Sequence, residues 1–167
     1  MAFRLQSYFE VQAEITNPLD LTTASAPLSM ARQLSLAQGT GAGQADMIFS
    51  DQFTIAASAT QALDLAGSLA GPLGGTLTFA RIKMILVFAA SGNTNNVNLV
   101  MPASNGTPLF LAAGDGIAVK PGGAFIWFDP SAAGVAVTAG TGDLLNLVNS
   151  AAGTPVTADV VIVGASA

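Results

Sequence analysis

Residues 76–88 read TLTFARIKMILVF and carry the clearest strand signal in the chain. Alternate positions from Ile82 to Phe88 are apolar, as on one face of a β-strand. The other face is also apolar from Ile85 onward, which is typical of a strand in the interior of a sheet. We therefore predict a central strand over Thr76–Phe88.

Shorter strand signals surround this stretch. Met47–Ile55 alternates between apolar and polar side chains, which predicts a half-buried strand. Turns rich in glycine and proline separate the signals that follow, and in Lys120–Gly123 the residue Gly122 suits the positive φ of a type II turn. The further predicted strands are Asn96–Met101, Pro108–Ala112, Gly116–Val119, Ala124–Phe128, Gly134–Thr138, Leu144–Val148 and Ala158–Val163.

Many short strands joined by tight turns predict an all-β fold. The expected form is an antiparallel β-sandwich or jelly roll of about eight to ten strands with an N-terminal arm. A parallel fold needs helical crossovers, and the sequence contains no helical stretch of that length. The chain is therefore predicted to divide into an arm with a flexible linker (1–45) and a β-sandwich domain (46–167).

The N-terminal segment differs in composition from the remainder. Its amphipathic opening is followed by Thr22–Gly43, whose Ser, Ala, Gln and Gly content is typical of a linker, although Leu28–Gln38 could form a short helix. An alternative is that the opening is simply the first strand of the core domain. As an arm, it would bind a neighbouring chain through apolar side chains, and the candidates are Phe3, Tyr8, Phe9, Val11 and Ile15.

The charge content favours a protein that packs against other proteins. Only 9% of the residues are charged, against roughly 25% in an ordinary soluble domain. A neutral surface is inexpensive to bury, because it carries few charges to desolvate.

The net charge of −5 and the five dispersed basic residues argue against direct nucleic-acid binding. Arg81 and Lys83 are the exception to that dispersal, and alternation predicts that they share one face of a strand.

Catalytic signatures are missing from the sequence. The chain contains no His and no Cys, so it cannot form the nucleophilic sites that use those residues. Asp115, Asp129 and Asp143 lie near predicted loops without the spacing of a known cation loop, and we predict that they cap turns. We expect no enzymatic activity, no catalytic or metal-binding residues and no cofactor.

Targeting signals are also missing. The N-terminal residues lack the apolar run of a secretory signal, and Met84–Ala90, the longest apolar stretch, is too short to cross a bilayer. We therefore expect synthesis in the cytoplasm and no membrane partner.

Four stretches of the chain resemble small virion structural proteins of tailed bacteriophages. They are Leu63–Gly67, Thr76–Lys83, Pro121–Phe125 and Val137–Leu145. The likeness spans roughly residues 60–166 and consists of strands and turns, not of a catalytic signature. Among such proteins, a small acidic all-β chain with an arm is most similar to a capsid cement or decoration protein.

That resemblance implies a structural role and a location. The protein would bind the major capsid protein on the outside of the capsid and stabilise the shell. It would form trimers or dimers on the shell. It would use no cofactor, and it would be made in the cytoplasm of the host. The low charge of the chain itself predicts a closed homo-oligomer, with a trimer as the expected form.

Two other functions remain open. A tail, fibre or spike component that contacts the host surface would share the same fold class. A free sugar-binding domain would need aromatic platforms, whereas this chain has one Trp and one Tyr. Alternation pairs Trp127 with Phe125, which favours a core or interface position for its side chain.

Overall fold

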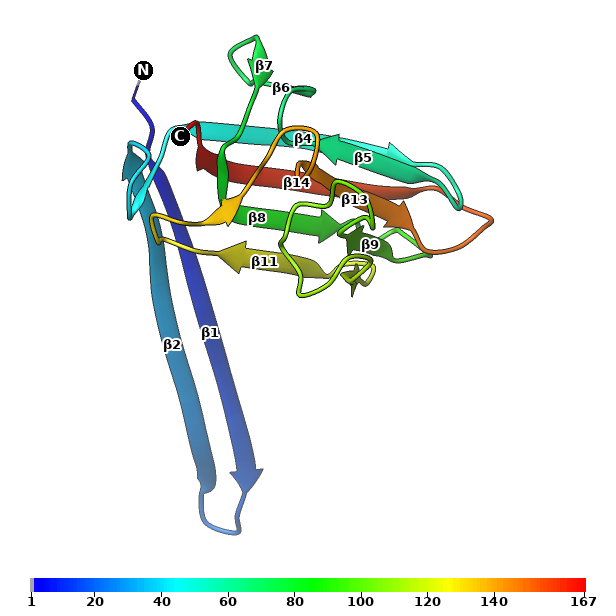
Figure 1. The fold of residues 1–167 in the computed structure, drawn as a ribbon. Coiled ribbons are helices and arrows are strands. Elements are labelled where there is room, and N and C mark those ends of the chain that lie inside the picture. The colour runs from blue at the N-terminus through cyan, green and yellow to red at the C-terminus, as the bar shows by residue number, and fades with distance from the viewer. Residues whose placement is uncertain (1) are drawn as a thin grey trace.

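The computed structural model describes residues 2–167 as an all-β protein with a long projecting arm (Figure 1). Residues 2–167 form fourteen strands and no helix. In this part of the chain, no helix with the length and apolar character of a membrane span is found. The all-β prediction is therefore confirmed.

The larger of two main sheets has the strand order β11-β8-β14-β4, with β12 paired to β8. All of its strand pairs are antiparallel, and β8 lies between β11 and β14. This position confirms the predicted central placement for the second part of the predicted strand. We call this sheet the arm-side sheet, and its strands are β4 (Met47–Ile55), β8 (Arg81–Ala89), β11 (Ala124–Phe128), β12 (Val135–Ala136) and β14 (Val156–Ala165).

The second main sheet is also antiparallel and has the order β10-β9-β13-β5. Buried side chains from both sheets, such as Ile85, Leu99 and Ile162, belong to one hydrophobic core. Trp127 packs against that core, as alternation suggested. The strands of this sheet are β5 (Thr60–Asp64), β9 (Val97–Val100), β10 (Gly116–Val119) and β13 (Leu144–Asn149).

The predicted strand over Thr76–Phe88 is interrupted. Its first two residues form β7 (Thr76–Leu77), which pairs with β6 (Leu69–Ala70) in a small ribbon. Phe79 then turns into the core, where it is 1% exposed, and its N–H donates to the Leu65 carbonyl at 2.9 Å. Burying this large ring accounts for the break before β8.

Loop geometry confirms one turn and corrects one strand. Gly122 has a φ of 72°, and the Gly123 N–H donates to the Lys120 carbonyl at 2.8 Å, as the predicted turn requires. The strand predicted over Pro108–Ala112 is wrong, because these residues form a bent loop. The Leu109 N–H donates to the Thr107 carbonyl at 2.7 Å, which turns the chain at the start of that segment.

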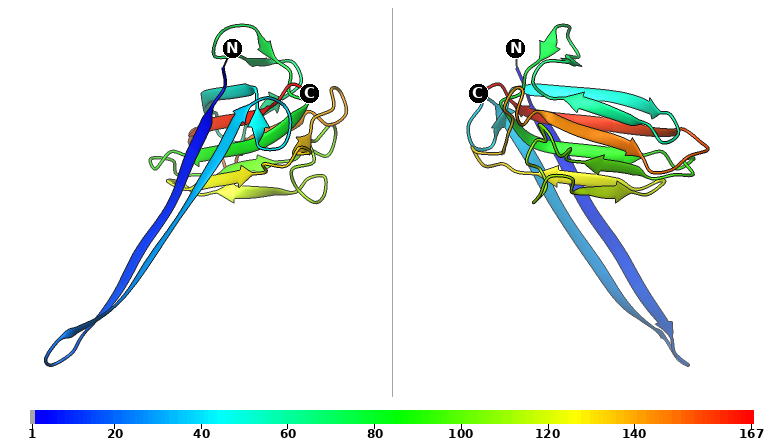
Figure 2. Two further views of the ribbon diagram at one scale, coloured as in Figure 1. Left: turned by 90° about the vertical axis from the view of Figure 1, so that its left-hand side faces the viewer. Right: turned by 45° about the vertical axis from the view of Figure 1, so that its right-hand side comes forward.

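The arm is an antiparallel hairpin of β1 (Leu5–Pro18) and β2 (Thr23–Gln38). It extends far beyond the two main sheets (Figure 2). The last residues of β2 pair in parallel with β3 (Gln44–Ala45). The hairpin and β3 therefore form a third sheet of order β1-β2-β3, separate from the two main sheets.

This hairpin corrects the expected linker and helix. Most of Thr22–Gly43 is strand, and the helix suggested for Leu28–Gln38 is wrong. The physical reason is that β1 supplies a paired strand along residues 23–36 of β2, and β3 pairs with its last two residues. The alternative that β1 is a strand of either main sheet is not what the structure shows.

Candidate partner-binding surface

The two faces of the arm differ sharply in polarity. Directly opposed residues of an antiparallel pair point to the same side, so the β1–β2 register assigns every side chain to a face. Ser7, Asn17 and Arg32 interrupt one face that is otherwise apolar. We call it the apolar arm face, and its apolar members are Leu5, Phe9, Val11, Ala13, Ile15, Ala24, Ala26, Leu28, Met30, Leu34 and Leu36.

The opposite face, which we call the polar arm face, carries hydrogen-bonding side chains. Ser25 donates to a Glu14 carboxylate oxygen at 2.6 Å, and Gln12 donates to Glu10 at 2.6 Å. Solvent can hydrate such a face without cost. The amphipathic pattern therefore gives the arm one side suited to water and one suited to burial.

The base of the apolar arm face is anchored on the arm-side sheet. Leu36 is 1% exposed and clusters with Met84 of β8 and Val163 of β14. Phe3 and Leu5 pack against the same cluster. This contact fixes where the arm leaves the main sheets.

Beyond its base, the apolar arm face is uncovered. Val11, Ile15, Leu28 and Met30 are 41%, 76%, 56% and 44% exposed. A two-stranded hairpin by itself is marginally stable in water, and a contiguous exposed apolar surface marks an interaction site. The distal half of this face is therefore the candidate partner-binding surface.

A cleft of about 380 Å³ lies in the angle between the arm and the arm-side sheet. The arm lines it with Ser7, Tyr8, Phe9, Glu10 and Leu34, and the sheet lines it with Met84, Leu86, Phe88 and Ile126. Phe88 points to the outer side of the sheet and is 42% exposed. The apolar surface of the arm thus continues onto an apolar sheet surface.

The predicted partner-binding residues occupy three different places. Phe9, Val11 and Ile15 lie on the apolar arm face, whereas Tyr8 lies on the polar arm face and is 71% exposed. Phe3 precedes β1 and packs at the base of the arm.

Sequence reasoning missed the half of this surface that β2 supplies. Leu28, Met30, Leu34 and Leu36 occupy alternate positions, with Arg32 in the same series. This period of two was the available signal.

The three loop carboxylates cap turns, as predicted. Asp115 accepts the Ala112 N–H at 2.9 Å, and Asp129 accepts the Ser131 N–H at 2.7 Å. Asp143 accepts the Gly140 N–H at 2.5 Å. Within residues 2–167, no cluster of three acidic side chains is arranged to hold a metal ion.

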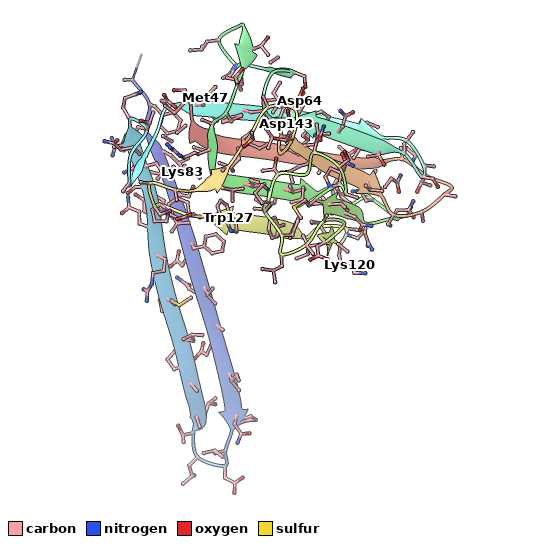
Figure 3. The ribbon with its side chains drawn as sticks, viewed as in Figure 1. Met47, Asp64, Lys83, Lys120, Trp127 and Asp143 are labelled. Carbon is pink, nitrogen blue, oxygen red and sulfur yellow. The ribbon has the colours of Figure 1, made fainter. Side chains whose placement is uncertain are left out.

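Arg81 and Lys83, which alternation placed on one face of a strand, differ in their surroundings. Lys83 is 0% exposed, and its Nζ donates to the Ser131 carbonyl, whereas Arg81 donates to the Ala167 carbonyl. The reason is a register shift between β14 and β8 at Val163/Gly164, which breaks the alternation beside Lys83. Figure 3 shows Lys83 at the end of β8 nearest the arm.

Burial lowers the pKa of Lys83 below its ordinary value of 10.5, with the Asp129 carboxylate opposing this shift and Arg81 adding to it. The folded state therefore binds the Lys83 proton less tightly than the unfolded state does. The Lys83 contribution to stability consequently rises with pH from the lowered pKa up to about 10.5.

We expect Lys83→Met to leave stability at pH 7 unchanged or to raise it by about 1 kcal/mol, because an apolar side chain of similar length avoids burying a charge. The variant should also lose the stability gain between the lowered pKa and pH 10.5. Urea unfolding across this pH range measures both effects. Lys120→Met is the control, because Lys120 is exposed and its loss should leave the gain in place. A pH-dependent gain that persists in Lys83→Met would contradict this assignment.

Comparisons with protein-family models, with curated proteins and with solved structures found no match. Function is therefore inferred from the surfaces and residues of the chain itself.

Proposed function

We propose that this chain is a non-enzymatic structural protein that joins the subunits of a protein assembly through its arm. The observation that carries the proposal is the uncovered apolar face on a hairpin that extends beyond the main sheets. An amphipathic hairpin is able to bury its apolar side against another subunit while its polar side stays hydrated.

The low charge of the chain supports this role. Fifteen of its 167 residues are charged, so few charges need to be desolvated when a neighbouring subunit packs against its surface. Burying the exposed apolar side chains contributes roughly 25 cal/mol per Å² of apolar surface removed from water. Packing into an assembly is therefore favourable for a surface of this kind.

The assembly we propose is a bacteriophage capsid. The resemblance of residues 60–166 to virion proteins supports this choice, and a projecting arm suits a protein that reaches a neighbour on a shell. The protein would act as a cement or decoration protein on the capsid exterior, with the major capsid protein and further copies of itself as partners. In the same proposal, the two main sheets form a β-sandwich of jelly-roll type.

Polar substitutions on the apolar arm face test this function. Val11 and Met30 are directly opposed on that face, and we expect Val11→Asn with Met30→Asn to weaken binding to the assembly about tenfold or more, through lost apolar burial. Binding is measured by co-sedimentation with capsids that lack this protein, together with light scattering of the protein alone.

The matched control uses the neighbouring opposed pair on the polar arm face, with Gln12→Asn and Ser29→Asn. These changes should leave binding within about twofold of the original, since the side chains remain polar and hydrated. Equal binding by the two double variants would remove the arm from the mechanism. Binding to host cells in place of capsids would favour a tail or spike component.

A further inference from the structure

One chain carries two apolar surfaces that lack a partner. The first is the distal half of the apolar arm face, and the second is the outer face of the arm-side sheet beside β8. There Phe88 is 42% exposed and borders the cleft together with Ile126, whereas Leu86 and Val161 pack against the cluster at the base of the arm. Both surfaces border the cleft in which the arm and the sheet meet.

The arm covers the sheet of its own chain around Met84, Leu86 and Val161 but leaves Phe88 exposed. Only its base is buried there, through Leu36 and its neighbours. From Val11 outward the hairpin is exposed, and it runs beyond the edge of the main sheets (Figure 2). Phe88 consequently stays accessible to another chain.

The charges on these two surfaces are complementary. Within residues 5–36, Arg32 is the one charged side chain on the apolar arm face. This side chain is exposed. Asp159 is exposed on the outer face of the arm-side sheet, directly opposite Phe88 in the β8–β14 register. By the register Glu10 and Glu14 belong to the polar arm face, and of these two Glu10 borders the cleft. An arm laid on this sheet therefore meets a charge of opposite sign.

The available area favours a reciprocal contact. Eight opposed residue pairs, Val11–Pro18 with Thr23–Met30, form the exposed half of the arm, and at about 3.3 Å per residue and about 10 Å across they cover about 260 Å². One arm on one sheet would bury about 500 Å² in total, whereas a specific interface needs about 1,000 Å². Two copies that exchange arms reach about 1,000 Å², whereas each interface of a cyclic trimer would hold one contact of about 500 Å².

We propose that two copies of this chain exchange arms, so that the apolar arm face of each copy binds the outer face of the arm-side sheet of the other. The contact places Arg32 of one copy beside Asp159 of the other. Met30, two residues from Arg32 on the same face, then lies beside Phe88. This inference rests on the proposed function, because it names the surface that the arm binds.

Single-cysteine variants test the contact directly, because the chain contains no cysteine. Met30→Cys is mixed with Phe88→Cys under mild oxidation, and disulfide-linked peptides are identified by mass spectrometry. Both positions are exposed, at 44% and 42%, so the variants should fold. We expect at least about tenfold more mixed disulfide than from the control Ser29→Cys with Phe88→Cys, because Ser29 lies on the polar arm face and points away. Equal yields from Met30→Cys and Ser29→Cys would overturn the proposal. A single chain that carries both Met30→Cys and Phe88→Cys would also overturn it if its disulfide formed only within that chain.

Charge reversal gives a second readout. Arg32→Asp alone and Asp159→Arg alone should each raise the dissociation constant of the pair about tenfold, and the two changes combined should restore it. Sedimentation equilibrium at low salt measures the association. One outcome would separate this proposal from the proposed function. The charge reversals would leave the dissociation constant unchanged and the cysteine pairs would give equal disulfide yields, while Val11→Asn with Met30→Asn still abolished capsid binding. The arm would then bind a different chain, and the exchange would be wrong. If the arm substitutions have no effect on any association, the proposed function itself is wrong.

Discussion

Leu99→Ala should lower the free energy of unfolding by about 2–5 kcal/mol, the cost of leaving a cavity in a packed core. Leu99 is 0% exposed and lies in β9, between β10 and β13. It sits directly opposite Ile117 of β10 and Leu147 of β13, and its side chain belongs to the core that both main sheets share. Because strands on both sides hold its backbone, the surroundings can collapse only partly into the space.

Urea or thermal unfolding measures this loss, and the chain offers a matched control. Leu111 lies in the loop after Thr107 and is 104% exposed. The same Leu→Ala change there should alter the free energy of unfolding by no more than about 0.5 kcal/mol. If Leu99→Ala and Leu111→Ala proved equally mild, the shared core would have to be assigned elsewhere.

Local alternation predicted the strands in which one face is buried and the other is solvated. The bounds of β4, β10 and β11 coincide with the predicted segments. Local alternation missed β5 (TQALD) because Leu63 is the one buried apolar side chain in this strand. The conformation of β5 depends on its pairing with β13. Short strands of this kind depend on distant partners.

The interior of β8 shows a second limit of local patterns. Alternation placed Phe88 on one face with Ile82, whereas Ile82 lies in the core and Phe88 lies on the outer side of the arm-side sheet. It also placed Lys83 beside Arg81, whereas the register shift against β14 buries Lys83. A bulge depends on how two strands meet, so one strand's sequence does not reveal it.

The candidate site was half predictable. The apolar side chains Phe9, Val11 and Ile15 of β1 were identified from their aromatic and branched character. Their partners in β2 lie among Ser, Ala and Gln residues, a composition typical of linkers. What turns β2 into a strand is its pairing with β1, and composition does not report such pairing.

Gly164→Ala should destabilise the protein by at least about 3 kcal/mol, because overpacking against backbone atoms cannot be relieved by rotating a side chain. A Cβ at residue 164 would lie 2.1 Å from the Arg81 carbonyl oxygen and 2.7 Å from Cδ1 of Phe79. Neither neighbour is free to move, since Phe79 is buried and the Ala80 N–H donates to the Ala165 carbonyl at 2.8 Å. The change therefore forces β14 and β8 apart at their register shift.

That position also adjoins the base of the arm, because Val163 precedes Gly164 and packs with Leu36. We therefore expect Gly164→Ala to loosen the arm as well as the main sheets, which hydrogen exchange at the β2 amides would show as reduced protection. Gly92→Ala is the control, since an added Cβ there meets no atom within 4 Å and should change stability by no more than about 0.5 kcal/mol. Wild-type stability in Gly164→Ala would mean that β14 and β8 do not approach as closely at this point as the structure shows.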